Sequence, residues 1–198
     1  MPETENMTID AKLKMVDQLR RQSLKYEELS PAVATAAWME TLPAYMRQNP
    51  QDGSWHRQPL SIDEMKMVIR EMFGGSEADA DRVFTEAVEV GRSRQAGRWI
   101  AQGLSAGEVA TNGAKAGWAL DEVVAAIDQA YAADDSATTR SALARDPKTP
   151  PIYLEALAGR ALVGDLGLAI ALRSNPAARA LVDRSVPTEQ LTLDGPDI

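Results

Sequence analysis

The sequence predicts an all-α fold, a helical bundle followed by a short α-repeat-like C-terminal region. Alanine is abundant and only 5% of the 198 residues are aromatic, a composition that favours helices packed closely through small side chains. Alternating runs of Val, Ile, Tyr and Thr, which would indicate strands, are absent. Near the C-terminus a short motif recurs, which is typical of stacked helical units.

A helical domain is expected over residues 8–135, after a disordered tail at residues 1–7 and with a candidate sub-boundary at residues 49–60. Thr8 is a suitable N-cap for a helix that extends to about residue 28. Ser30 and Pro31 restart a helix that Pro43 kinks or ends. The turn formers of residues 49–59 predict an exposed loop. The apolar faces expected for the two helices are Ile9, Leu13, Val16, Leu19 and Leu24, and then Val33, Ala37 and Trp38.

Four more helices are predicted between residues 61 and 135. Ser61 and Glu64 fit a capping box on the first, which Gly74 ends. A helix should follow from about residue 77 to residue 94, and Ser105 with Glu108 forms a second capping box on a short helix. The last segment has the clearest amphipathic pattern. Its apolar positions are Leu120, Val123, Val124, Ile127 and Tyr131.

Residues 136–185 are predicted to form the α-repeat-like helices, with a flexible tail over residues 186–198. An Ala-Leu pair followed by an Asx-Pro pair occurs twice in this region. Each proline breaks a helix, because it lacks an N–H donor and disfavours helical geometry in the residue before it. The recurring positions are Ala142-Leu143 with Asp146-Pro147, and Ala171-Leu172 with Asn175-Pro176.

The segment 140–158, RSALARDPKTPPIYLEALA, resembles a unit of the leucine-rich repeat variant family, which reads approximately ALAxNPxTPxxxLxxLA. The segment 168–182, LAIALRSNPAARALV, resembles the next unit, without the Thr-Pro after its Asn-Pro. The resemblance implies an α-helix and a 3₁₀-helix per repeat, stacked in a right-handed solenoid that serves as a binding surface. The cysteine-bound iron–sulfur cluster of that family is not implied, since this chain has no cysteine.

Composition excludes several classes of function. The absence of cysteine rules out disulfides and thiolate metal sites, and the single histidine, His56, leaves no pair for a zinc site. The net charge of −8 disfavours broad binding to nucleic acid, which requires Lys and Arg to neutralise phosphates. No apolar stretch is long enough for a membrane span, and the polar start of the chain is unlike a signal peptide. We therefore expect a cytoplasmic protein with no metal, no cofactor and no membrane partner.

Trp55, His56 and Arg57 lie in the predicted loop and are candidates for binding a partner protein. Tryptophan and arginine are enriched among the residues that contribute most to protein–protein affinity. The alternative is that Trp55 folds back onto the helices and covers the core. Catalysis by His56 is not expected, because no Ser or Cys nucleophile motif accompanies it.

The tail offers a second set of candidate partner-binding residues, Gln190, Leu191 and Leu193. They resemble the short peptide by which many bacterial replication and repair proteins bind the sliding clamp, although Asp194 stands where that peptide commonly has Phe. Alternating leucines in an extended tail can enter one hydrophobic groove of a partner. The alternative is that the tail docks on the last repeat.

A local basic cluster is the candidate for nucleic-acid binding, since arginines hold phosphates and an aromatic ring stacks on a base. Arginines at a helix C-terminus also complement the helix dipole, which is the alternative reading of the same residues. The cluster consists of Arg92, Arg94, Arg98 and Trp99.

Taken together, these features predict a non-enzymatic adaptor or inhibitor of the kind common among small acidic bacterial and phage regulators. It would bind another protein through helical surfaces. The alternative is a nucleic-acid-associated replication or repair factor that acts through the tail or through the Arg/Trp cluster. An enzyme with a carboxylate-only site is a third hypothesis, and it requires two carboxylates converging in a pocket.

Overall fold

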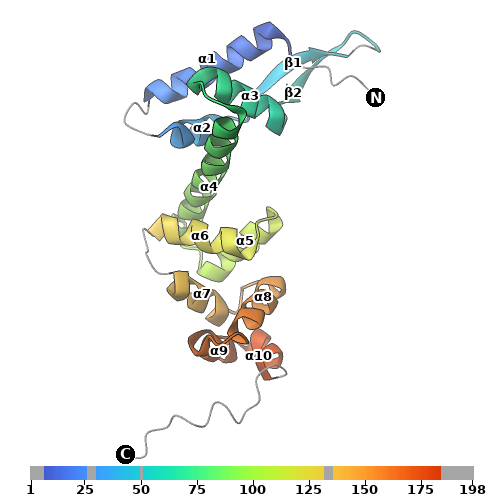
Figure 1. Ribbon diagram of the computed structural model, residues 1–198. Helices are drawn as coiled ribbons and strands as arrows, with labels where there is room; N and C mark the ends of the chain where they lie inside the picture. The colour runs from blue at the N-terminus through green and yellow to red at the C-terminus, as the bar shows by residue number, and fades with distance from the viewer. Residues whose placement is uncertain (1–6, 26–29, 50, 132–135, 184–198) are drawn as a thin grey trace, which may run out of the picture. The chain divides into compact units, whose positions relative to one another are not determined.

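The computed structural model describes residues 7–25, 30–49, 51–131 and 136–183 (Figure 1). These residues form ten helices and one two-stranded sheet, so the predicted all-α class is confirmed. The chain divides into two compact units, Met1–Gly91 and Arg92–Ile198, and the division falls within the helix α4 (Glu77–Ala101). The domain limit expected at residues 135 and 136 lies inside the second unit.

The first unit holds three further helices and the sheet around one core. α1 packs on α2 and on α3, and Leu19, Trp38 and Val68 are completely buried between them. The predicted capping box of Ser61 and Glu64 is present at the start of α3. The elements are α1 (Ile9–Lys25), α2 (Pro31–Met39), β1 (Ala44–Gln48), β2 (Trp55–Pro59) and α3 (Ile62–Phe73).

The apolar face predicted for α1 is wrong in part. Ile9, Leu13 and Leu24 are 75%, 59% and 60% exposed, whereas Met15 and Leu19 are buried. The buried face is therefore rotated about the helix axis toward Met15, a residue that the predicted stripe omitted. As a result α1 presents exposed apolar side chains as well as polar ones.

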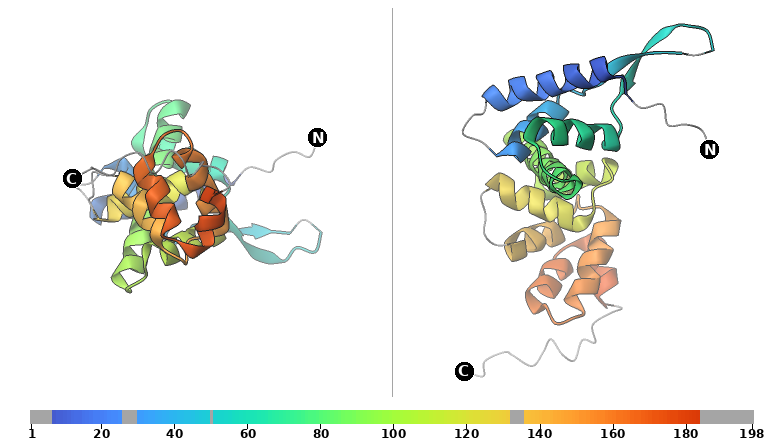
Figure 2. Two further views of the ribbon diagram at one scale, coloured as in Figure 1. Left: turned by 90° about the horizontal axis from the view of Figure 1, so that it is seen from below. Right: turned by 45° about the horizontal axis from the view of Figure 1, so that its top comes forward.

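β1 and β2 form an antiparallel hairpin, so the prediction of an exposed loop over residues 49–59 is wrong for β2. The predicted turn formers make its tip: Gly53 adopts a positive φ of 71°, and its N–H donates to the Asn49 carbonyl. The strands pair from Ala44 opposite Pro59 to Gln48 opposite Trp55. Most of the hairpin is exposed and projects beyond the helices of its unit (Figures 1 and 2). Backbone pairing rather than core burial defines these strands, and so they lack the apolar alternation that predicts a strand.

The second unit stacks three helix pairs in layers (Figure 2). α7 packs on α5, α6 and α9, and α8 packs on α9 and α10. One continuous core runs through the layers, and Val109, Leu143 and Leu172 are completely buried in it. The helices are α5 (Ala106–Lys115), α6 (Leu120–Tyr131), α7 (Ser136–Arg145), α8 (Pro151–Ala161), α9 (Leu166–Arg173) and α10 (Pro176–Asp183).

The two Asx-Pro breaks, 29 residues apart, lie in direct contact. The Nδ2 of Asn175 donates to the Asp146 carbonyl at 2.9 Å, and its Oδ1 accepts from the Ala177 N–H at 3.0 Å. Asn175 is 0% exposed. The Oδ1 of Asp146 accepts from the Lys148 N–H at 2.9 Å in the equivalent turn. The sequence recurrence therefore corresponds to equivalent turns stacked on one another.

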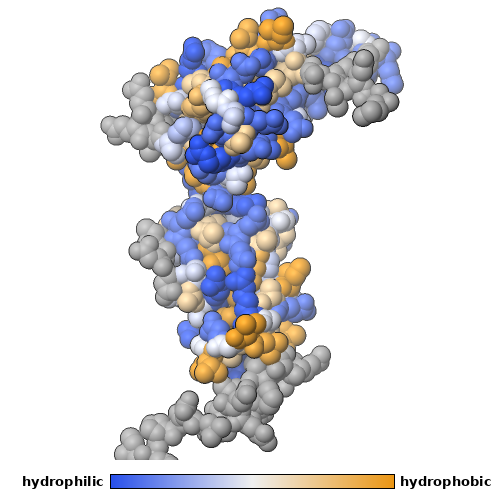
Figure 3. Space-filling model, viewed as in Figure 1, coloured by the Kyte–Doolittle hydropathy of each residue, from blue (hydrophilic) through white to orange (hydrophobic). Residues whose placement is uncertain are grey.

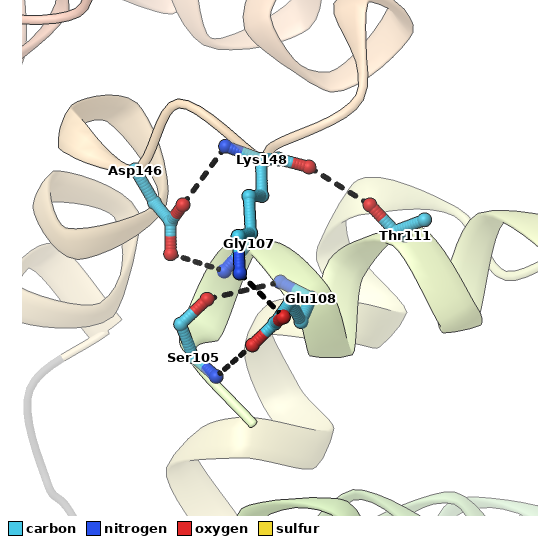
Figure 4. A network of polar contacts seen from close by, with 6 residues as sticks. All are labelled: Ser105, Gly107, Glu108, Thr111, Asp146 and Lys148. Atoms are coloured by element: carbon cyan, nitrogen blue, oxygen red, sulfur yellow. Dashed lines mark hydrogen bonds and ion pairs between the residues drawn. The ribbon is translucent and has the colours of Figure 1, made fainter. Parts of the chain in front are cut away.

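The Asp146 carboxylate also ties α7 to the start of α5 (Figure 4). Its Oδ2 accepts from the Gly107 N–H at 2.9 Å, and the predicted capping box of Ser105 and Glu108 surrounds this contact. Glu108 in turn pairs with Lys148 at 2.6 Å. A Cβ on Gly107 would come within 2.5 Å of the carboxylate, so this approach requires glycine.

The second unit is expected to lose stability in acid because of Asp146. Burial raises the pKa of Asp146, but hydrogen bonds from Lys148, Ser105 and Gly107 outweigh it and hold the pKa below its ordinary value. A pKa that is lower in the folded than in the unfolded state adds stability above the unfolded value, and that stability disappears as the pH falls through the folded value. Urea unfolding should therefore require less denaturant below about pH 4.

The matched variants for this pH dependence are Asp146→Asn and Glu155→Gln, the latter at an exposed carboxylate of α8. Asp146→Asn should flatten the acid limb of the curve, whereas Glu155→Gln should leave it as in the wild type. Equal acid limbs in all three proteins would contradict the assignment to Asp146.

Candidate partner-binding site

A groove runs along α1 beside the hairpin, entirely within the first unit. Side chains that alternate along a strand share a face, so Met46, Trp55 and Arg57 lie on one face of the sheet. That face and one side of α1 enclose two adjacent depressions, which share Gln18, Arg21 and Ala44 as lining residues. The depression lined by Trp55 is called the Trp55 depression, and the one lined by Arg57 the Arg57 depression. Together they form the groove.

The Trp55 depression has a volume of about 540 Å³ and is lined on one side by Thr8 and by α1 as far as Arg21. Trp55 and Met46, which lie on its hairpin wall, are 63% and 57% exposed. Large apolar side chains beside a concave surface are a usual feature of protein-binding sites. A segment of 14 residues of α1 is about 21 Å long, which accommodates about six residues of extended peptide.

The Arg57 depression, of about 370 Å³, lies where α2 leads into β1. Trp38 is completely buried and lines it, while Arg21 and Arg57 contribute its two charged side chains. The Nη2 of Arg57 donates to the Leu42 carbonyl at 3.0 Å, which holds the guanidinium at the rim. Leu42 adopts a positive φ of 52°, the left-handed conformation through which the chain turns after α2.

Tyr45 holds the hairpin against the helices. Its side chain is buried in the core of the first unit, and its hydroxyl donates to Glu64 Oε1 at 2.9 Å. Burial, followed by the hydrogen bond to Glu64, raises the pKa of Tyr45 above its ordinary value. Glu64 also accepts from the Ser61 N–H in the capping box of α3. The hairpin, which forms one wall of the groove, is thus attached to α3 through Tyr45 and Glu64.

The predicted trio of Trp55, His56 and Arg57 is divided by the sheet. Trp55 and Arg57 line the groove, whereas His56 lies on the other face of β2, opposite Arg47. The exposure of Trp55 favours a surface role over the alternative in which it covers the core. Sequence reasoning missed Arg21, Met46 and the rest of α1, because these residues join the site only through the hairpin.

The basic cluster lies on the part of α4 that belongs to the second unit, and only its Trp99 packs against the core. The Nη1 of Arg92 pairs with Glu122 Oε1 at 2.6 Å, and Arg94 and Arg98 also have interaction partners. Trp99 packs against the core, with its ring centroid 5.4 Å from that of Trp118. Arg92 and Trp99 are thus engaged in contacts within the unit, whereas Arg98 is exposed. The nucleic-acid alternative stays a prediction.

A second exposed apolar surface lies over the end of α8 and the start of α9 (Figure 3). The depression beside Lys148 in the second unit is lined by other residues, from α5, the loop before it and the loop after α7. This apolar surface is the alternative to the groove for binding a partner. Its residues are Leu162, Val163, Leu166 and Ile170, between 51% and 88% exposed.

No protein family, curated protein or solved structure matches the chain. The resemblance of residues 140–182 to leucine-rich repeat variants stays a prediction, as does that of the tail to a clamp-binding peptide. Gln190, Leu191 and Leu193 lie outside the described residues. Among the helices described, none combines the length and the apolar character needed to cross a membrane.

Proposed function

We propose that this protein is a non-enzymatic adaptor or inhibitor that binds an extended segment of a partner protein in the groove. The observation that carries the proposal is Trp55, 63% exposed on the wall of a depression of about 540 Å³. An exposed tryptophan contributes a large contact area at little cost in side-chain entropy, which is why such residues dominate binding energies.

The groove favours a peptide segment over a small metabolite. Both of its depressions are partly open and adjoin each other along α1, whereas small-molecule sites usually enclose most of their ligand. Among the described residues, no group of acidic or histidine side chains is arranged to hold a metal ion. The lining combines apolar side chains with amide and charged groups of both signs, a mixture that can recognise both the side chains and the backbone of an extended peptide.

The proposal predicts that Trp55→Ala abolishes capture of the partner. The tagged full-length chain is used to capture proteins from cognate lysate, and quantitative mass spectrometry compares wild type, Trp55→Ala and Tyr131→Ala. Tyr131 is 60% exposed in the second unit and serves as the matched control. A partner should be recovered with wild type and Tyr131→Ala but depleted at least tenfold with Trp55→Ala, since truncating such an anchor costs about 2 kcal/mol or more. The same set of proteins recovered with all three chains would contradict the proposal.

A further inference from the structure

Within the groove, the Trp55 depression is lined by charged side chains of both signs, whereas the charged side chains that line the Arg57 depression are all positive. Arg21 comes from α1 and Arg57 from β2, and no Asp or Glu is among the residues that line this depression. The whole chain carries a net charge of −8, so a depression lined by two arginines and by no carboxylate is a local exception. Guanidinium groups bind carboxylates through paired N–H donors and remain charged at all physiological pH values.

The two arginines are held differently. Arg57 is fixed by its bond to the Leu42 carbonyl, which uses one of its five N–H donors. Arg21 pairs with Asp17, one turn earlier on α1, at 2.7 Å, and both side chains are more than half exposed. Exposed pairs of this kind contribute little free energy, so Arg21 can exchange Asp17 for another carboxylate. Arg57 is therefore the main anion-binding group and Arg21 the secondary one.

The uncharged residues that line the Arg57 depression include one buried side chain and several polar ones. Trp38 is 0% exposed and lines the Arg57 depression, and its Nε1 has no hydrogen-bond partner among the described residues. A buried N–H without an acceptor is destabilising. The depression is also lined by Gln18, Gln22 and Thr41, so its lining favours a polar occupant over an apolar one.

Spacing on β2 relates the charge to Trp55. Trp55 and Arg57 are two residues apart on one face of the strand, a separation of about 7 Å. Alternate side chains of an extended peptide that faces the strand have the same separation. A peptide that places an apolar side chain against Trp55 thus places the side chain two positions away against Arg57.

We propose that the groove recognises an extended segment of a partner protein in which an apolar residue and an acidic residue are separated by one position. The apolar side chain binds at Trp55 and Met46, and the carboxylate of Asp or Glu binds at Arg57 with support from Arg21. This inference rests on the proposed function, because it specifies the segment that the groove binds.

Selection from a displayed library of random linear 12-residue peptides tests the pattern directly. The full-length wild-type chain is the bait, and peptides that also bind Trp55→Ala are removed. The remaining peptides should be enriched in Asp or Glu two positions from an apolar residue. Peptides that need Trp55 but show no acidic enrichment would overturn the inference and leave the proposed function standing. If no peptide depends on Trp55, the proposed function is wrong as well.

Calorimetry with the strongest peptide tests the residues. Arg57→Gln should weaken binding about tenfold, as expected for loss of a charged hydrogen bond, and Arg21→Gln about threefold. Arg20→Gln is the matched control, since Arg20 is exposed, adjacent on α1 and lines neither depression. Unchanged affinity in Arg57→Gln would overturn the inference.

Changing the peptide removes any dependence on the folding of a variant. The same peptide with its acidic residue replaced by the matching amide should bind the wild type about tenfold more weakly and should not distinguish wild type from Arg57→Gln. A peptide whose binding is lost on amidation of its C-terminus, but not on replacement of its acidic side chain, would show that the groove takes a terminal carboxylate and would overturn the proposed pattern.

Discussion

Replacing Asn175 by alanine is expected to lower the free energy of unfolding of the second unit by about 3 kcal/mol. Asn175 is fully buried, and its amide serves two partners, the Asp146 carbonyl and the Ala177 N–H. Alanine leaves both without their partner and removes the cap of α10. A buried polar group that loses its partner costs more than the hydrogen bond itself contributed.

The control for this variant is Ser174→Ala, at the exposed residue just before Asn175. It should change the free energy of unfolding by less than about 0.5 kcal/mol. Urea unfolding gives the free energies, and amide hydrogen exchange locates the change. Faster exchange should be confined to α7–α10. An effect of Asn175→Ala no larger than that of Ser174→Ala would show that the stacked Asx turns do not hold this unit together.

Replacing Leu19 by alanine should destabilise the first unit by about 3 kcal/mol and remove the groove. Leu19 is completely buried, and it attaches α1 to the core that also contains Trp38 and Val68. Deleting its side chain leaves a cavity beneath the helix that forms one wall of the site. Binding of the selected peptide should fall together with stability, although Leu19 itself lines neither depression.

Leu13→Ala is the matched control, because Leu13 lies on the same helix and is 59% exposed. Its removal should cost less than about 0.5 kcal/mol and leave peptide binding intact. Thermal unfolding followed by circular dichroism separates the two variants. Equal melting temperatures for Leu19→Ala and Leu13→Ala would mean that α1 is not attached to the core through this face.

Local capping signals predicted much of the helical framework. Ser61 with Glu64 and Ser105 with Glu108 form the capping boxes that their spacing indicated, since such a box depends only on residues three apart. The Asx-Pro pairs predicted helix breaks for the same local reason. That the Asn175 side chain bonds to the Asp146 backbone could not be predicted, because the contact depends on how the helices stack.

The groove was predictable only in its two most conspicuous residues. Trp55 and Arg57 stood out as an exposed aromatic and a cation in a turn-rich segment, and both line it. The hairpin was missed, because exposed strands held by backbone pairing show no apolar alternation. Without the hairpin, nothing in the sequence relates Arg57 to Arg21, which lies on a helix far away in the chain.

Amide hydrogen exchange, measured with and without the selected peptide, tests the central claim that the groove is the partner-binding site. Binding is expected to slow exchange in α1 and in the hairpin strands β1 and β2, and to leave α8 and α9 unchanged. Slower exchange confined to α8 and α9, where Leu162, Val163, Leu166 and Ile170 are exposed, with α1 and the hairpin unchanged, would contradict it.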